Sequence, residues 1–101
     1  MQKNLKILNG ANMANIKTVV TTYAEFIGDC NEGADTVVIK KPRMVIQSEK
    51  GFGFAKGVCV TSVSEPEEVT IQKANVVMVV DTNPEVLKAY EEATSIIQQV
   101  N

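Results

Sequence analysis

The sequence contains no histidine and no tryptophan, and only two of its 101 residues are cysteine. Histidine is the side chain best suited to general base catalysis near neutral pH, and it is the commonest metal ligand. A structural zinc site needs four ligands, usually cysteine or histidine, so two cysteines alone cannot form one. The sequence therefore predicts no metal site.

Glycine-rich nucleotide-binding loops are missing as well. The segment Gly51-Phe52-Gly53 lacks the third glycine and the strand-to-helix context of a dinucleotide-binding fingerprint. The carboxylates Glu65, Glu67 and Glu68 flank Pro66, a composition typical of an exposed loop rather than of an active site. We therefore predict that the protein is not an enzyme and uses no cofactor.

Long hydrophobic runs are also absent. No apolar segment approaches the roughly 18 residues needed to cross a bilayer, and Met1 to Lys6 lacks the apolar region of a signal peptide. These features predict a cytoplasmic protein with no membrane partner. Cys30 and Cys59 lie in segments expected to form strands, which favours buried free thiols over a disulfide.

The stretch from Val69 to Val80 organises the fold. Val69-Thr70-Ile71 alternates in the manner of a strand, and Gln72 to Asn75 is a short polar break. Five consecutive apolar residues follow, Val76 to Val80, four of them valine. Because valine disfavours helix and favours a pleat, this run predicts a strand buried on both faces. The break predicts a sharp corner between two strands of one curved sheet.

Four earlier segments also have strand composition: Ile16 to Thr22, Glu25 to Asn31, Thr36 to Ile46 and Phe52 to Val63. Gly28 lies in the middle of the second, where glycine weakens a strand unless the sheet bends there. Pro42 interrupts the third, since proline cannot donate a ladder hydrogen bond. A bend of this kind predicts a strongly curved sheet or a barrel.

The C-terminal segment predicts a helix. Asn83 can cap it, Pro84 suits its first position, and Glu85 suits the positive end of the helix dipole. We expect this helix to cover an open end of the sheet, although it could instead dock a partner.

The sequence as a whole thus predicts a mainly β fold: a small, strongly bent antiparallel barrel with a C-terminal helix. Within this one domain we expect an N-terminal arm over 1–15, the barrel over 16–81 and the helix over 82–101.

Charge is unevenly distributed along the chain. The formal net charge is −2, but residues 36–56 carry five basic residues and one acidic residue, which leaves −6 on the remainder. Segregated charge of this kind marks either an anion-binding face or a solvated hairpin whose lysines discourage aggregation.

Several short motifs resemble those of the Sm-like family, which includes Sm and LSm proteins and Hfq-type RNA chaperones. The first Sm motif has counterparts in four segments: Val19-Val20, Thr21 to Ala24, Phe26-Ile27-Gly28 and Asp35-Thr36-Val37. The second has a counterpart in Ile71 to Val76, with Gln72-Lys73 in place of the usual Arg-Gly pair. Short Sm-like proteins of phages that infect cyanobacteria share three further segments: Glu25 to Gly28, Lys41-Pro42 and Gly53-Phe54.

The resemblance implies an Sm-like, SH3-like barrel whose edge strands pair between copies to close a homo-oligomeric ring of roughly five to seven subunits. It also implies binding of single-stranded RNA, or DNA, without catalysis, in the cytoplasm of a bacterial or phage-infected cell. The residues that it and the charge pattern together point to are Lys40, Lys41, Arg43, Gln72, Lys73 and Asn75.

A second function fits the same sequence. An oligomeric structural or adaptor protein could bind other proteins through the helix or the strand edges, with its lysines serving only solubility. Against nucleic-acid binding stand the acidic sequence pI of about 5.1 and the small number of aromatic residues. Core packing is the plain interpretation of three of them, Tyr23, Phe52 and Phe54.

Overall fold

The computed structural model describes residues 15–61 and 65–94. The elements in chain order are β1 (Ile16–Thr21), β2 (Glu25–Glu32), β3 (Thr36–Ser48), β4 (Gly51–Phe54), β5 (Glu68–Gln72), the 3-10 helix η1 (Lys73–Asn75), β6 (Val76–Asp81) and α2 (Pro84–Thr94). The mainly β architecture with one C-terminal helix is therefore confirmed. Residues 1–14 of the arm predicted over 1–15, and residues 95–101 of the helix predicted over 82–101, lie outside the described residues.

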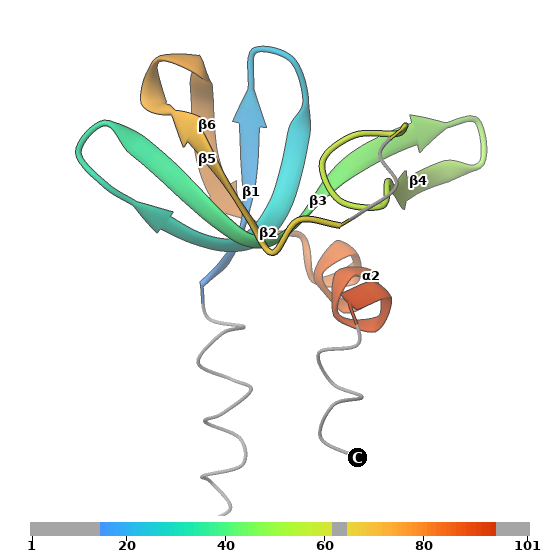
Figure 1. The fold of residues 1–101 in the computed structure, drawn as a ribbon. Coiled ribbons are helices and arrows are strands. Elements are labelled where there is room, and N and C mark those ends of the chain that lie inside the picture. Colours follow the sequence, from blue (N-terminus) through green and yellow to red (C-terminus); the bar gives the residue numbers. More distant parts are fainter. Residues whose placement is uncertain (1–14, 62–64, 95–101) are drawn as a thin grey trace, which may run out of the picture.

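The six strands form one antiparallel sheet in which β3 is the longest member. The strand order is β4-β3-β2-β1-β6, and β5 also pairs with β3. The first half of β3, Thr36 to Lys40, pairs with β5, whereas Val45 to Ser48 pairs with β4. The strands spread from a common base, and the β3–β4 hairpin projects to one side (Figure 1).

The change of partner along β3 takes place at a bend. Lys41 has a positive φ of 50°, which is uncommon for a residue other than glycine. Pro42 follows it and is fully buried. The strand continues past Pro42 as one element of 13 residues, so the proline kinks the strand rather than ending it. This is possible because the bend lies between the segments that pair with β5 and β4, where a missing N–H leaves no ladder bond unmade.

Gly28 faces this bend from β2. The pairing of β2 with β3 shifts register between Ile27 and Asp29. A Cβ atom added at Gly28 would lie 2.4 Å from Ile39 Cγ2 and 2.8 Å from the Lys40 carbonyl oxygen. The expectation that the sheet bends at Gly28 is therefore confirmed, and the reason is close approach of the neighbouring strand.

Apolar side chains gather on both faces of the sheet. The larger cluster is formed by five buried residues from β1, β2, β3 and β5: Val19, Phe26, Val37, Ile39 and Ile71. The second cluster lies under the helix and contains Ile16, Ile27 and Tyr90. The sheet therefore has a core of its own on one face and a helix-covered core on the other.

Helix α2 begins and packs as its sequence predicts. The side-chain Oδ1 of Asn83 accepts a hydrogen bond from the Glu85 N–H at 2.8 Å, which caps the first turn. Tyr90 is fully buried against the sheet, and its hydroxyl donates to the Lys41 carbonyl oxygen at 2.8 Å. The helix therefore covers the sheet beside the bend. No helix within 15–61 or 65–94 has the length and apolar character needed to cross a bilayer.

The fourth predicted strand is much shorter than expected. It ends at Phe54 rather than at Val63, because the chain then folds back onto β3. The Ala55 N–H donates to the Met44 carbonyl, and the Met44 N–H donates to the Gly57 carbonyl. As a result Cys59 is exposed and outside any strand, contrary to its prediction as a buried residue. Cys30 is half-buried in β2, and burial raises the pKa of its thiol.

The corner between β5 and β6 is confirmed. The prediction that β6 is buried on both faces is wrong for the single chain, in which β6 is largely exposed. η1 makes the corner, and β6 pairs only with β1 among the described strands. Val77, Met78 and Val80 are 57%, 49% and 41% exposed. A run of apolar residues in the sequence does not distinguish a central strand from an apolar edge strand, and this one is an edge.

Replacing Gly28 with alanine should destabilise the fold by about 1–3 kcal/mol, because the new methyl group would overlap Ile39 and the β3 backbone. Urea unfolding of the two proteins measures this difference. Gly53→Ala is the matched control, since a Cβ there meets no atom within 4 Å. Equal stability of the Gly28→Ala variant and the original protein would contradict the close approach.

Candidate functional site

The six predicted site residues fall into two groups at opposite ends of β5. Lys40 pairs with Glu68, the first residue of β5, and Gln72 is its last residue. The two ends of β5 are four residue steps apart, about 13 Å at the usual rise per residue. Lys40, Lys41 and Arg43 thus lie at the bend, whereas Gln72, Lys73 and Asn75 lie at the corner.

Lys40 stands between two carboxylates. It pairs across strands with Asp29 on β2 and with Glu68 on β5, so that one row of the sheet runs acid, base, acid. Opposite charges at directly facing positions stabilise a sheet. Asp29 Oδ1 is buried with no hydrogen-bond partner among the described residues, so a neighbouring positive charge is valuable to it. Lys40 is exposed and, although it lies opposite these two carboxylates, makes no ion pair within the described residues.

The other two cations at the bend differ from each other. The Arg43 side chain is only 13% exposed, and its Nη1 lies 3.2 Å from Glu65 Oε1. The Lys41 side chain is exposed, while its backbone is held on both sides: its N–H donates to the Glu67 carbonyl and its carbonyl accepts from Tyr90. Arg43 therefore ties the bend to the acidic loop, and Lys41 remains available to a ligand.

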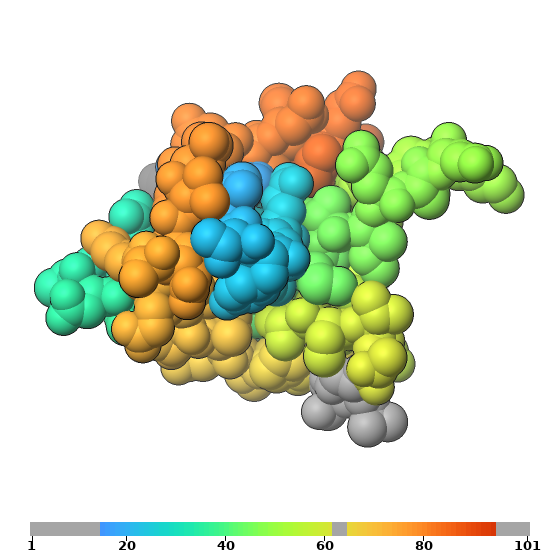
Figure 2. All heavy atoms as spheres, turned by 90° about the horizontal axis from the view of Figure 1, so that it is seen from above, coloured from blue at the N-terminus to red at the C-terminus, as the bar shows by residue number. Residues whose placement is uncertain are grey.

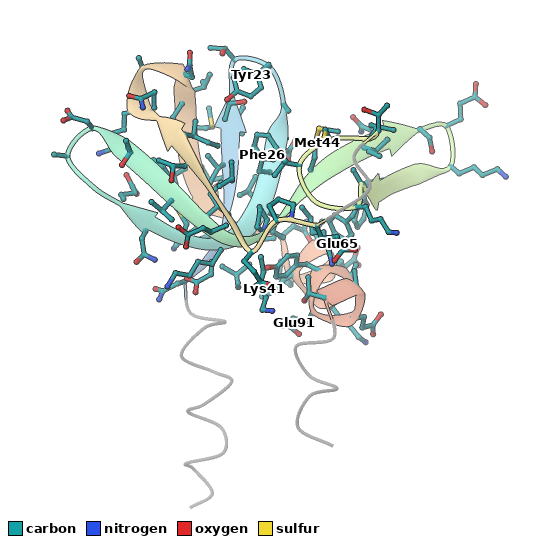
Figure 3. The ribbon with its side chains drawn as sticks, in the orientation of Figure 1. Tyr23, Phe26, Lys41, Met44, Glu65 and Glu91 are labelled. Carbon is teal, nitrogen blue, oxygen red and sulfur yellow. The ribbon has the colours of Figure 1, made fainter. Side chains whose placement is uncertain are left out.

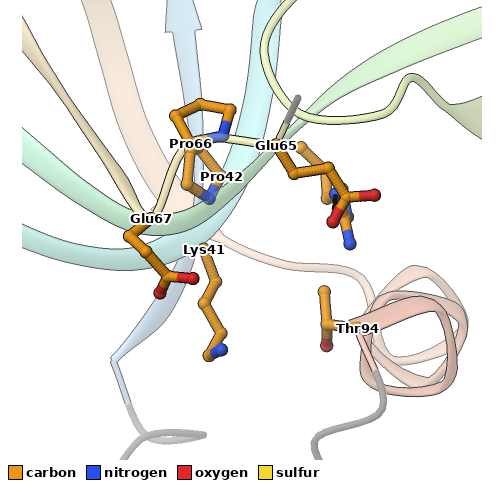
Figure 4. Close-up of a pocket in the computed structure, with 7 residues that line it drawn as sticks. Lys41, Pro42, Glu65, Pro66, Glu67 and Thr94 are labelled. Atoms are coloured by element: carbon orange, nitrogen blue, oxygen red, sulfur yellow. Dashed lines mark ion pairs between the residues drawn. The ribbon is translucent and has the colours of Figure 1, made fainter. Parts of the chain in front are cut away.

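A small open cavity of about 90 Å³ lies at the bend. Residues 41–43, residues 65–67 and Thr94 line it, as Figure 4 shows. Its two cations, Lys41 and Arg43, are matched by two carboxylates, Glu65 and Glu67. Because these charges cancel, the cavity does not by itself select an anion.

The corner group is fixed by the two neighbouring turns. The Lys73 N–H donates to the Asp35 carbonyl, and the Asn75 carbonyl accepts from the Thr22 N–H. Lys73 Nζ lies 3.9 Å from Glu32 Oε1, so its charge is partly offset as well. The corner presents polar side chains but little net positive charge.

Folding therefore brings acids to two of the five bases that are clustered in the sequence: Arg43 pairs with Glu65, and Lys40 lies opposite Asp29 and Glu68. Within the described residues, no ion pair involves Lys40, Lys41, Lys50 or Lys56. Lys40 and Lys41 lie at the bend, Lys50 lies in the turn of the β3–β4 hairpin and Lys56 follows β4. The sequence does not reveal these pairings, because the acids of residues 65–68 lie far along the chain.

Two aromatic side chains that were predicted to pack in the core are exposed. Tyr23, at the β1–β2 turn, is 64% exposed, and Phe52 on β4 is 43% exposed. Phe54 is half-buried against the helix cluster. Figure 3 shows Tyr23 at the end of the sheet farthest from Lys41. The sequence pattern missed these surfaces because the strand that carries Phe52 projects beyond the core.

The described residues contain no group of three or more histidine, cysteine, aspartate or glutamate side chains that could hold a metal ion. No protein-family model and no curated protein matches the sequence. Support for a function therefore comes from the geometry of the chain itself.

Tyr90 gives a pH test of the contact that holds the bend. Burial raises the pKa of its hydroxyl above the usual value of about 10. The folded state then binds more protons than the unfolded state above that pH, so the free energy of unfolding falls as the pH rises. We expect Tyr90→Phe to cost about 1 kcal/mol near pH 8, through loss of the bond to Lys41, and to weaken this alkaline decline.

Urea unfolding at pH 8 and near pH 11 measures both effects. The control is Tyr23→Phe, which removes an exposed hydroxyl and should leave the wild-type profile in place. An identical alkaline decline in the Tyr90→Phe variant would show that Tyr90 does not govern it.

Proposed function

We propose that the protein is a non-catalytic, Sm-like subunit of a homo-oligomeric ring that binds single-stranded nucleic acid. The observation that supports assembly into a ring is the exposed apolar edge formed by β6. A strand edge offers unpaired N–H and C=O groups, and natural proteins usually protect such an edge with charge, proline or a covering segment. Val77, Met78 and Val80 instead leave it apolar and accessible among the described residues.

The sheet has a second edge that can receive β6. Among the described strands, β5 pairs only with β3, so its other side also offers free backbone groups. Pairing of β6 of one copy with β5 of the next uses two different surfaces, which produces a ring when the rotation between copies closes. An assembly of this type removes both of these edges.

The topology supports an Sm-like barrel by analogy with that fold. The order β5-β3-β2-β1-β6, the bend at Gly28 and the 3-10 corner between β5 and β6 agree with the motifs that resemble the family. Fold-level analogy alone does not give function, so the nucleic-acid part of the proposal rests on charge.

Repetition of the subunit multiplies a small number of positive charges. One subunit offers few unpaired cations at the bend, chiefly Lys41 with a contribution from Lys40. A ring repeats each of them, and several weak phosphate contacts on one strand combine into useful affinity. Gln72 and Asn75 add amide groups at the corner that can donate and accept hydrogen bonds. If the ring binds no nucleic acid, the same apolar edges support the structural or adaptor function instead.

Met78→Glu should dissociate the assembly while leaving the subunit folded. The side chain is exposed in one chain, but a buried carboxylate between copies would be costly. We expect sedimentation to give a lower mass, and the association constant to fall at least about tenfold. The control is Val60→Glu, an exposed apolar residue outside the strands. A wild-type protein that stays monomeric at about 50 μM, a concentration well above the dissociation constants usual for specific assemblies, would rule out the ring.

Lys40→Gln combined with Lys41→Gln should weaken binding to short oligonucleotides and flatten its salt dependence. For a single strand, each phosphate that a lysine no longer neutralises lowers the slope of log affinity against log salt by roughly 0.7. Fluorescence anisotropy at two salt concentrations measures both the affinity and this slope. Lys88→Gln, an exposed lysine of α2, is the matched control. Equal slopes for the double variant and the wild-type protein would show that the bend is not part of the binding surface.

A further inference from the structure

We propose that the β3–β4 hairpin, residues 44–54, is a nucleic-acid-binding arm on which Phe52 stacks a base of a single strand. The inference rests on the proposed function and assigns to it a surface distinct from the bend and the corner. The end of this hairpin stands clear of the rest of the molecule in Figure 2, so an extended strand can reach it without a change in the fold.

The two faces of the arm differ in chemistry. Phe52 lies opposite Gln47, and Phe54 lies opposite Val45, so these four residues share one face. Ile46 and Gly53 form a cross-strand pair on the other face. Val45 and Phe54 pack against the helix cluster, and the same face continues outward to Gln47 and Phe52, which are exposed.

The Phe52 ring is exposed and held in place. It packs against Phe54 in an edge-on arrangement, with ring centroids 5.6 Å apart and planes at 73°. Phe54 packs in the same manner against the fully buried Tyr90, at 6.3 Å and 80°. This row of three rings connects Phe52 to the core, so stacking of a base on it requires little additional ordering. Base stacking on an aromatic side chain is sequence-tolerant and strong enough to matter, since its removal weakens binding roughly tenfold or more per base.

The segment around the arm is net positive, although the hairpin turn itself holds one acid and one base. Lys50 lies two residues before Phe52 in this turn, next to Glu49, and neither side chain makes an ion pair among the described residues. Outside residues 36–56 the chain carries a net charge of −6, so phosphates are repelled by most of the protein and attracted to this region. The exposed Gln47 amide, across from Phe52, can donate to and accept from a base edge. Aromatic ring, cation and amide thus lie within one short hairpin.

The other exposed aromatic side chain lacks these neighbours. Tyr23 is more exposed than Phe52, but it lies at the end of the sheet where Lys73 is paired with Glu32 and where Glu25 follows the turn. Its surroundings within the described residues therefore offer no unpaired cation for a phosphate. The combination of an exposed ring with an unpaired lysine distinguishes the arm.

The test compares oligonucleotides with and without bases. We expect the full-length Phe52→Ala variant to bind oligouridylate and oligothymidylate of about 12 nucleotides roughly tenfold more weakly, as removal of one stacked base requires. Binding to an abasic chain with the same number of phosphates should not change. Phe52→Tyr should keep the wild-type affinity because it keeps the ring. The two oligonucleotides also show whether the sugar matters.

The opposite face of the hairpin supplies the control. Ile46 is 37% exposed, close to the exposure of Phe52, and Ile46→Ala should leave affinity unchanged. If Phe52→Ala does not fold, as judged by circular dichroism, Phe52→Leu tests removal of the ring with most of the apolar volume kept. If the wild-type protein binds but the Phe52 variants bind equally well, or lose the abasic chain to the same extent, the stacking role is wrong. If the wild-type protein binds neither oligonucleotide, the proposed function itself fails, and the stacking role fails with it.

Discussion

The bend at Lys41 and Pro42 is the constraint on which the rest of the structure depends. It divides β3 into one half that pairs with β5 and another that extends into the hairpin. Three interactions secure it: close packing against Gly28, the bond from Tyr90 to the Lys41 carbonyl, and the bond from the Lys41 N–H to Glu67. A left-handed conformation at a lysine persists only where its surroundings determine it, and here a strand, a helix and a loop all do so.

The same bend explains why a basic segment of sequence does not become a strongly basic surface. It brings residues 65–68 alongside residues 40–43, so that Arg43 pairs with Glu65 and Lys40 faces Glu68. The charge of Arg43 is therefore used to join two segments of the chain. Lysines without an ion pair among the described residues remain at Lys40 and Lys41 in the bend and at Lys50 in the hairpin. From the charge pattern of the sequence alone, Lys40, Lys41 and Arg43 are equally good candidates for phosphate binding.

The features that the sequence predicted well are local. Gly28, the cap at Asn83 and the polar break after Ile71 each imply a backbone geometry from a few neighbouring residues, and all three are found. The misjudged features depend on interactions between distant segments. The strand that begins at Gly51 ends early because Met44 bonds to the returning chain, and the exposure of β6 depends on whether a second strand covers it. For the same reason the sequence named the lysines of the candidate site without indicating which of them have acidic partners.

In the proposed ring, assembly and binding depend on each other. The unpaired cations of one subunit are few, and the body around them is acidic, so a single copy has little to hold a polyanion. A ring formed through β5 and β6 would leave α2, the bend and the hairpin free, since none of them lies at those two strand edges. Each added copy would then supply one more lysine at the bend and one more aromatic ring on the arm. Affinity for a strand long enough to touch several copies should therefore rise steeply with its length, whereas a mononucleotide should bind weakly.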